Sequence, residues 1–258
     1  PILLTLHDTC YCSQIWFADD AGAGGSLKEM KKWWEKLNDV GPSHGYFPKP
    51  SKSWFIVKEE YLEEAKQLFD GCGVNITIEG HERYVGTPIG TEEFTKKVVK
   101  GKVNDWIVDL RRLIDLAKSE PQLVYAAYTF GLSKRWIYLM RTTPNISELL
   151  QPLEQVIKSE FLPVLIGQAF NNNMRAIFAL PPKFGGLGIF NPSQISDKEY
   201  EYSRSVTSTF IKVILDQIVS NYFVDDSNTE DLFDSISAEI SKHRKVVHTK
   251  KSQFHKQN

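Results

Sequence analysis

Apolar and polar positions along the first ninety residues follow patterns that predict strands and helices in turn. Strands are expected at 15–17 and 53–57, where short apolar runs are bounded by turn residues. Helices are expected at 26–40 and 59–69, where apolar residues recur at steps of three and four. The apolar run within 1–13 fits a helix or a strand, because it is too short for its period to decide. This order predicts an α/β layout in which helices cover one face of a sheet.

The first of these helices has clear signals at both ends. Ser26 is a natural N-cap, and Gly41 followed by Pro42 is a natural stop. Trp33 and Trp34 lie on its apolar stripe, and we expect them in the core rather than stacked on nucleic-acid bases.

A hairpin is expected near the end of this region. Residues 74–79 alternate and are β-branched, Gly80 and His81 supply a turn, and residues 83–85 resume an extended pattern. The simplest interpretation of this stretch is an edge hairpin.

Beyond Gly90 the pattern becomes helical. Thr91 can cap a long amphipathic helix that ends before Pro121. Residues 181–192 are rich in glycine and proline and show no periodicity, which indicates a loop. Further helical stretches are expected at 122–140, 146–162, 168–179 and roughly 194–222.

These elements predict an α+β protein in three parts. Residues 1–90 contain the sheet and its covering helices, and residues 91–222 are mainly α-helical. Residues 223–258 form a polar tail in which acidic residues precede Lys242 and basic residues follow it.

Composition limits the class of protein. With 258 residues, 41% of them apolar, the chain can bury a substantial core. Its net charge of −1 means that any nucleic-acid surface must be local. Three cysteines form no even disulfide framework, and no apolar run approaches the ~20 residues of a membrane span. We therefore expect a globular intracellular protein of the cytoplasm or nucleus, without a membrane partner, and the sequence does not indicate its oligomeric state.

Two adjacent carboxylates, Asp19 and Asp20, follow the first strand and precede a glycine-rich turn. Carboxylates held at a sheet edge can bind two Mg²⁺ ions ~4 Å apart. The alternative is a solvated turn in which Asp20 caps the next segment. An aromatic-x-Asp-Asp match arises by chance in about one chain in twenty of this length, so the later segments must decide.

Those segments resemble a known family. Phe17 to Asp20 resembles the aromatic-x-Asp-Asp box of reverse transcriptases, and residues 14–46 resemble the version in eukaryotic retrotransposon polymerases. Three further segments are similar to family motifs and follow in the family's order: GYFPKPSKSW at 45–54, RYVGTPIG at 83–90 and LPPKFGGLGI at 180–189. The second has Val-Gly where the family usually has Leu-Gly. The resemblance covers about residues 14–220.

The resemblance implies a partial polymerase palm, an antiparallel sheet with helices on one face, followed by a helical thumb and connection region. Asp19 and Asp20 would be carboxylates for Mg²⁺ or Mn²⁺, with Asp19 the more direct ligand. Lys52 would lie near the triphosphate of the incoming dNTP and protonate the leaving pyrophosphate; without the family context it is an exposed loop lysine. Residues Tyr84, Val85 and Gly86 would hold the primer end. Phosphates of the RNA or DNA template and its primer would be contacted by Lys96, Lys97, Lys100 and Lys102.

The chain also departs from the family. A polymerase palm needs a further aspartate from a strand many tens of residues earlier, but only 18 residues precede Asp19 and their sole acid is Asp8. A tight hairpin could bring Asp8 close. The fingers region is also missing and the chain begins with Pro, so we expect an N-terminally truncated RNA-directed DNA polymerase that is inactive alone.

Two other interpretations remain. A non-catalytic retroelement remnant could bind nucleic acid or protein. An α/β hydrolase or an unrelated nucleotidyltransferase fits less well, because the chain has no nucleophile elbow and its acids are adjacent rather than separated by one residue.

Overall fold

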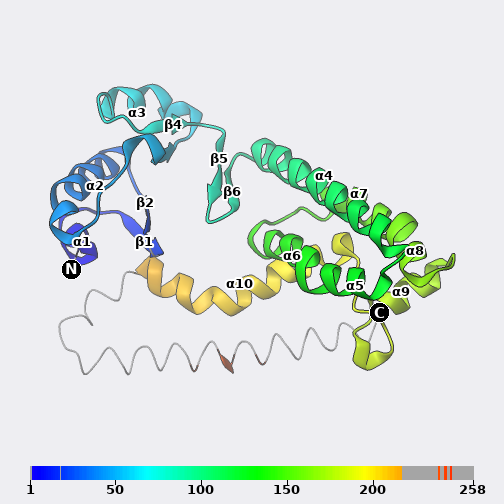
Figure 1. Cartoon of the computed structure of the whole chain (residues 1–258). Coiled ribbons are helices and arrows are strands. Elements are labelled where there is room, and N and C mark those ends of the chain that lie inside the picture. The colour runs from blue at the N-terminus through cyan, green and yellow to red at the C-terminus, as the bar shows by residue number, and fades with distance from the viewer. Residues whose placement is uncertain (1, 18, 217–237, 239–240, 243–244, 246–258) are drawn as a thin grey trace. The chain divides into compact units, whose positions relative to one another are not determined.

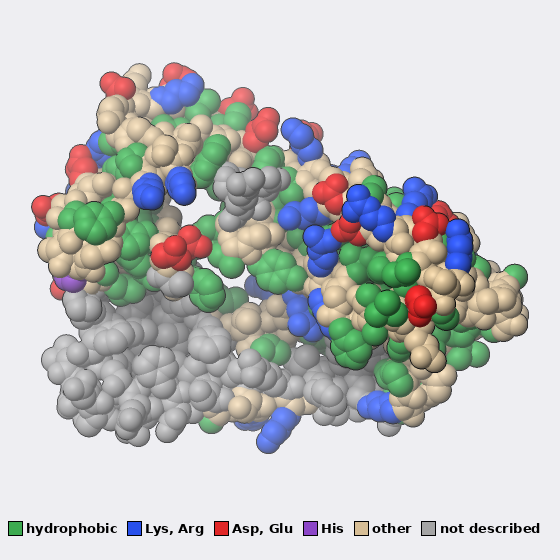
Figure 2. All heavy atoms as spheres, in the orientation of Figure 1, with side chains coloured by type: hydrophobic (Ala, Val, Ile, Leu, Met, Phe, Trp, Pro, Cys, Tyr) green, Lys and Arg blue, Asp and Glu red, His purple; other side chains and the backbone are tan. Residues whose placement is uncertain are grey.

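The computed structural model describes residues 2–17, 19–216, 238, 241–242 and 245, which form two compact units (Figure 1). Among these described residues, unit 1 contains 2–17, 19–81, 207–216, 238 and 241, and unit 2 contains 82–206, 242 and 245. In both units, basic and acidic side chains are interspersed over the face seen in Figure 2. Among the helices of these described ranges, none combines the length and apolar character that a membrane span requires. The predicted polar tail, 223–258, lies almost entirely outside the described residues.

Unit 1 consists of short elements around one central helix. In chain order they are α1 (Ile2–Thr9), β1 (Ser13–Phe17), β2 (Asp20–Gly24), α2 (Leu27–Val40), the 3₁₀ turns η1 (Pro42–His44) and η2 (Pro50–Lys52), β3 (Trp54–Ile56), η3 (Glu59–Tyr61), α3 (Leu62–Leu68) and β4 (Asn75–Thr77). The ambiguous run at the start of the chain is therefore a helix. The caps of α2 are as predicted: Ser26 Oγ accepts a hydrogen bond from the Glu29 amide, and the helix ends at Gly41.

The core of unit 1 forms on the apolar face of α2. Trp33 is 6% exposed and Trp34 is 9% exposed, which confirms that both tryptophans pack in the core. They join Leu6 of α1 and Phe69, which follows α3. Because α2 supplies the largest apolar side chains, the smaller elements pack around it.

One predicted pairing is wrong. Residues 74–79 and 83–85 do not form a hairpin; β4 instead pairs in parallel with β3, with Trp54 opposite Asn75. The two strands are parallel because α3 lies between them and serves as a crossover connection. The hairpin at this place is formed by β5 (Gly80–Tyr84) and β6 (Thr87–Gly90). Its turn has positive φ at Val85 (50°) and Gly86 (78°), as a type I′ turn requires.

The α+β class is confirmed, but the strands do not form the single antiparallel sheet that the sequence predicted. Within the described residues they form three separate two-stranded sheets: β1 with β2, β3 with β4, and β5 with β6. These strands are only three to five residues long.

Unit 2 is mainly helical. After the β5–β6 hairpin it contains α4 (Glu92–Ala117), α5 (Pro121–Ala126), the π-helix η4 (Ala127–Leu132), α6 (Ser133–Thr142), η5 (Glu148–Leu150), α7 (Gln151–Val156), the π-helix η6 (Ile157–Phe161), α8 (Leu162–Ile166), α9 (Asn172–Ala179) and η7 (Pro182–Phe184). The last helix, α10 (Pro192–Asp216), belongs to unit 2 up to Val206 and to unit 1 from Thr207. Thr91 caps α4 as predicted, accepting from the Phe94 amide. The predicted continuation of the last helix to 222 lies outside the described residues.

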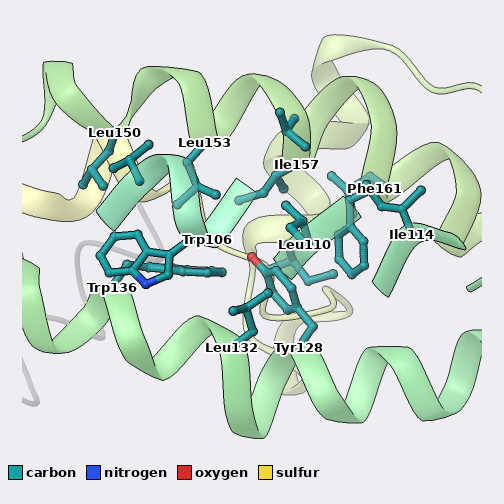
Figure 3. Packing of buried hydrophobic residues seen from close by; sticks show 14 of the residues in the cluster. Trp106, Leu110, Ile114, Tyr128, Leu132, Trp136, Leu150, Leu153, Ile157 and Phe161 are labelled. Carbon is teal, nitrogen blue, oxygen red and sulfur yellow. The ribbon is translucent and has the colours of Figure 1, made fainter. Parts of the chain in front are cut away.

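The core of unit 2 lies between α4, the α5–α6 segment and the α7–α8 segment (Figure 3). Tyr128 stacks on Phe161 with ring centroids 4.7 Å apart, and Trp106 lies 5.8 Å from Trp136. Trp136 is fully buried. The packed aromatic rings fix the three helical segments against each other.

The β5–β6 hairpin groups with these helices from Glu82 onward, whereas the sequence grouped it with the first ninety residues. The reason is local packing: β6 lies against α4, and the hairpin turn is bonded to Tyr138 of α6.

Candidate metal-binding hairpin

The β1–β2 hairpin places two carboxylates at its tip. The strands are antiparallel, with Ser13 opposite Gly24 and Phe17 opposite Asp20. Asp19 therefore falls in the turn that joins the strands, and Asp20 begins β2. Both residues are exposed. Two adjacent, solvent-accessible carboxylates are an oxygen donor pair of the kind that Mg²⁺ or Mn²⁺ accepts.

The inner face of the hairpin is fixed by a buried glutamine. Gln14 is 5% exposed, and its Oε1 accepts hydrogen bonds from Trp16 Nε1 (3.3 Å) and Trp33 Nε1 (3.2 Å). Its Nε2 donates to the Leu3 carbonyl (3.4 Å), so one side chain joins β1 to both α1 and α2. A buried polar group with satisfied donors and acceptors holds one register, because a shift of one residue would turn Gln14 to the solvent face and break its bonds to Leu3 and Trp33.

The outer face carries apolar side chains. Ile15 is 43% exposed and Phe17 is 67% exposed, while Gly22 lies opposite Ile15. This alternation of buried and exposed positions along β1 is the period-two pattern of a strand with one covered face.

Tyr46 supports the turn from the loop after α2. Its Oη donates a hydrogen bond to the Asp19 carbonyl (3.2 Å), and its ring meets Trp16 edge-on with centroids 5.2 Å apart. Burial raises the pKa of Tyr46, and the carboxylates of Asp20 and Asp19 raise it further. Because the folded-state pKa lies above the unfolded one, this contribution to stability is present below about pH 10 and is lost as the pH rises through the folded-state pKa. The phenol therefore senses the charge at the hairpin tip.

The structure does not add a third acid to this pair. Asp8 is exposed on α1, and within the described residues no three His, Cys, Asp or Glu side chains lie close enough to hold a metal ion. The possibility that a tight hairpin brings Asp8 to Asp19 and Asp20 is therefore wrong. Lys52 ends η2 and is exposed, and no ion pair in the described part of the chain joins it to the hairpin.

The candidate primer-holding residues lie in unit 2. Tyr138 Oη donates to the Val85 carbonyl, and Thr87 Oγ1 donates to Tyr138 Oη (3.5 Å). A Cβ atom at Gly86 would lie 3.5 Å from the Tyr138 ring. Tyr138 thus fixes the turn that carries Val85 and Gly86. Sequence reasoning did not find it, because an aromatic residue within a helical stripe gives no sign of a contact 53 residues away.

The four candidate lysines of α4 do not share one face. A helix turns about 100° per residue, so Lys96, Lys97 and Lys100 fall within about a third of its circumference. These three are exposed, whereas Lys102 is half-buried and points about 120° or more away from them. Lys96 pairs with Glu92 (2.6 Å). Over the region of α4 in Figure 2, basic side chains alternate with acidic ones.

Neither protein-family models, nor curated proteins, nor solved structures give a match to this chain.

Proposed function

We propose that this chain is the C-terminal palm and thumb portion of a reverse transcriptase-like polymerase, in which Asp19 and Asp20 hold Mg²⁺ or Mn²⁺ for template-directed DNA synthesis from dNTPs. The observation that supports this most is the geometry of the hairpin. Both carboxylates lie at the tip of the hairpin and are exposed to solvent, and Tyr46, from the loop after α2, donates a hydrogen bond to the turn. The ordered resemblance of the later segments adds to this support.

The residues of the hairpin fit such an ion in part. Two carboxylates match the oxygen preference of Mg²⁺, but a polymerase centre needs a further acid. A bound ion would supply charge stabilisation at the attacking 3′-hydroxyl and the departing phosphates. Asp19 and Asp20 would orient it, and the Tyr46 hydrogen bond would limit their motion. Because Asp19 and Asp20 are only part of the ligand set that a polymerase centre needs, they would bind the ion weakly.

The first test uses Tyr46 as a reporter of metal binding. Mg²⁺ added at neutral pH should shift the ring signals of Tyr46, because its phenol is bonded to the Asp19 carbonyl and lies beside both carboxylates. The metal titration can be followed by NMR of ring-labelled tyrosine, with Tyr46→Phe assigning the signal. In Asp19→Asn/Asp20→Asn the same signals should be indifferent to Mg²⁺. An equal metal response in the wild type and the double variant would refute the site.

A second test addresses activity. We expect no primer extension by the chain alone with Mg²⁺ or Mn²⁺ on an RNA template, because two carboxylates cannot position both ions. Incorporation of dNTPs that Asp19→Ala abolishes would show that the two acids suffice, contrary to the expectation.

A third test concerns duplex binding by α4, which both the polymerase proposal and a non-catalytic binding domain would require. Lys97→Ala/Lys100→Ala should weaken binding to a primer–template duplex and reduce the slope of log affinity against log salt by about two. Lys102→Ala is the matched control, because this side chain points away from the other three. Equal losses in both variants, or salt-independent binding, would contradict the assignment.

The non-catalytic alternative differs from the polymerase proposal at the hairpin. If duplex binding depends on Lys97 and Lys100 while the ring signals of Tyr46 do not respond to Mg²⁺, a binding domain is the better account. If duplex binding depends on these two lysines and Mg²⁺ also shifts the ring signals of Tyr46, the polymerase proposal is supported.

A further inference from the structure

A lysine and a cysteine from distant parts of unit 1 meet side by side. Lys31 Nζ of α2 lies 2.9 Å from Sγ of Cys72, in the loop between α3 and β4. The Lys31 side chain is 19% exposed, and its Nζ lies 5.5 Å from the centroid of the Phe69 ring and 3.5 Å from Glu35 Oε1. These neighbours hold the amino group over the sulfur, although the two residues are 41 positions apart.

The three cysteines differ in their access to solvent. Cys10 and Cys12 are buried in the core of unit 1, and burial raises the pKa of Cys12 to about 11. Cys72 is half-buried and lies between Gly71 and Gly73. Among the three thiols, only that of Cys72 is partly open to solvent, and oxidation by a small peroxide follows access. A small oxidant should therefore react at Cys72 before the other two.

We propose that Lys31 and Cys72 form a redox-controlled covalent crosslink, a sulfur–nitrogen bond made after oxidation of the thiol by a peroxide. In the first step the Cys72 thiolate attacks hydrogen peroxide; a sulfur–oxygen bond forms, the oxygen–oxygen bond breaks, and hydroxide leaves. In the second step the neutral amine of Lys31 attacks the sulfenic sulfur; a sulfur–nitrogen bond forms and water leaves with one amine proton.

The hydrogen bond to Cys72 is the largest cause that raises the pKa of Lys31. Oxidation of the sulfur to sulfenic acid weakens this hydrogen bond, so a larger share of Lys31 becomes the free amine that the second step requires. The product would link α2 to the loop after α3. Closing this long loop restricts the unfolded chain, so the oxidised protein should unfold at a higher temperature.

The test treats the full chain with hydrogen peroxide and follows intact mass and proteolytic peptides. The wild type should lose two hydrogen atoms and yield one crosslinked peptide pair containing Lys31 and Cys72, and a thiol reductant should reverse both changes. Cys72→Ser should give no such pair.

Lys31→Arg is the matched control, since it keeps the positive charge beside the sulfur but offers no condensing amine. In this variant Cys72 should gain oxygen atoms without forming a crosslink. The proposal is overturned if the wild type behaves like Lys31→Arg, if Cys10 or Cys12 is oxidised first, or if the crosslinked peptides retain an oxygen atom between nitrogen and sulfur.

Discussion

Replacement of Arg175 by methionine is expected to lower the free energy of unfolding of unit 2 by about 3–5 kcal/mol. Arg175 Nε and Nη2 each donate to a carboxylate oxygen of Glu154 at 2.7 Å, and Nη1 donates to the Ile189 carbonyl at 2.7 Å. Both charged side chains are 8% exposed. The variant leaves the Glu154 carboxylate in the core without its cation, and a buried unpaired charge is far more costly than a lost surface pair.

Chemical denaturation of the variants measures this cost. Arg111→Met is the matched control, because Arg111 makes the same two-bond pair with Glu160 on the surface, where it should contribute less than about 1 kcal/mol. The double variant Glu154→Leu/Arg175→Met should regain much of the loss, since it removes both charges. Similar costs at Arg175 and Arg111 would show that burial of the pair is not what makes it important.

The features that the sequence predicts well are those with local signals. Ser26, Thr91 and Gly41 mark the ends of α2 and α4, because capping involves residues only a few positions apart. Pro163 is an instructive exception. The predicted helix 146–162 ends before Pro163, yet Pro163 is the second residue of α8, which continues directly from the π-helix η6.

The strand partners could not be predicted in the same way. Residues 74–79 have the alternation of a hairpin strand, but their partner is fixed by how α3 packs between β3 and β4. Local pattern identifies a strand without identifying the strand beside it. The α+β class followed from the order of elements, whereas the division into two-stranded sheets depended on tertiary packing.

The candidate site likewise combines features that local sequence predicts with features that depend on tertiary contacts. The strand that precedes Asp19 and Asp20 followed from an apolar run and two acids, but the expected glycine-rich turn is strand β2, and the turn itself falls at Asp19. The supports of the hairpin tip did not follow from local sequence: Tyr46 acts from 27 residues away, and Gln14 joins β1 to α1 and α2 through buried bonds. Nor does charge in the sequence distinguish the buried pair of Glu154 and Arg175 from a solvated one.

Replacement of Gly186 by alanine is the second change expected to have a large effect, at about 3 kcal/mol of lost stability. A Cβ atom there would lie 2.1 Å from the Leu180 carbonyl oxygen and 2.5 Å from that of Ile177. Both contacts are with backbone, so no side chain can rotate to relieve them. The glycine in the 180–189 segment is thus required by the close approach of this loop to the end of α9.

Gly101→Ala is the matched control for this variant. A Cβ atom at this exposed position in α4 meets nothing within 4 Å, and alanine should raise stability by up to about 1 kcal/mol.

The loss of stability in Gly186→Ala should also depend on the buried ion pair of Glu154 and Arg175. The same loop carries the Ile189 amide, which donates to the Phe178 carbonyl (3.0 Å), and the Ile189 carbonyl, which accepts from Arg175. A loop displaced by the new methyl group withdraws that acceptor, so Gly186→Ala should cost less in the Arg175→Met background than in the wild type. Strict additivity of the two costs would show that the loop moves without disturbing Arg175.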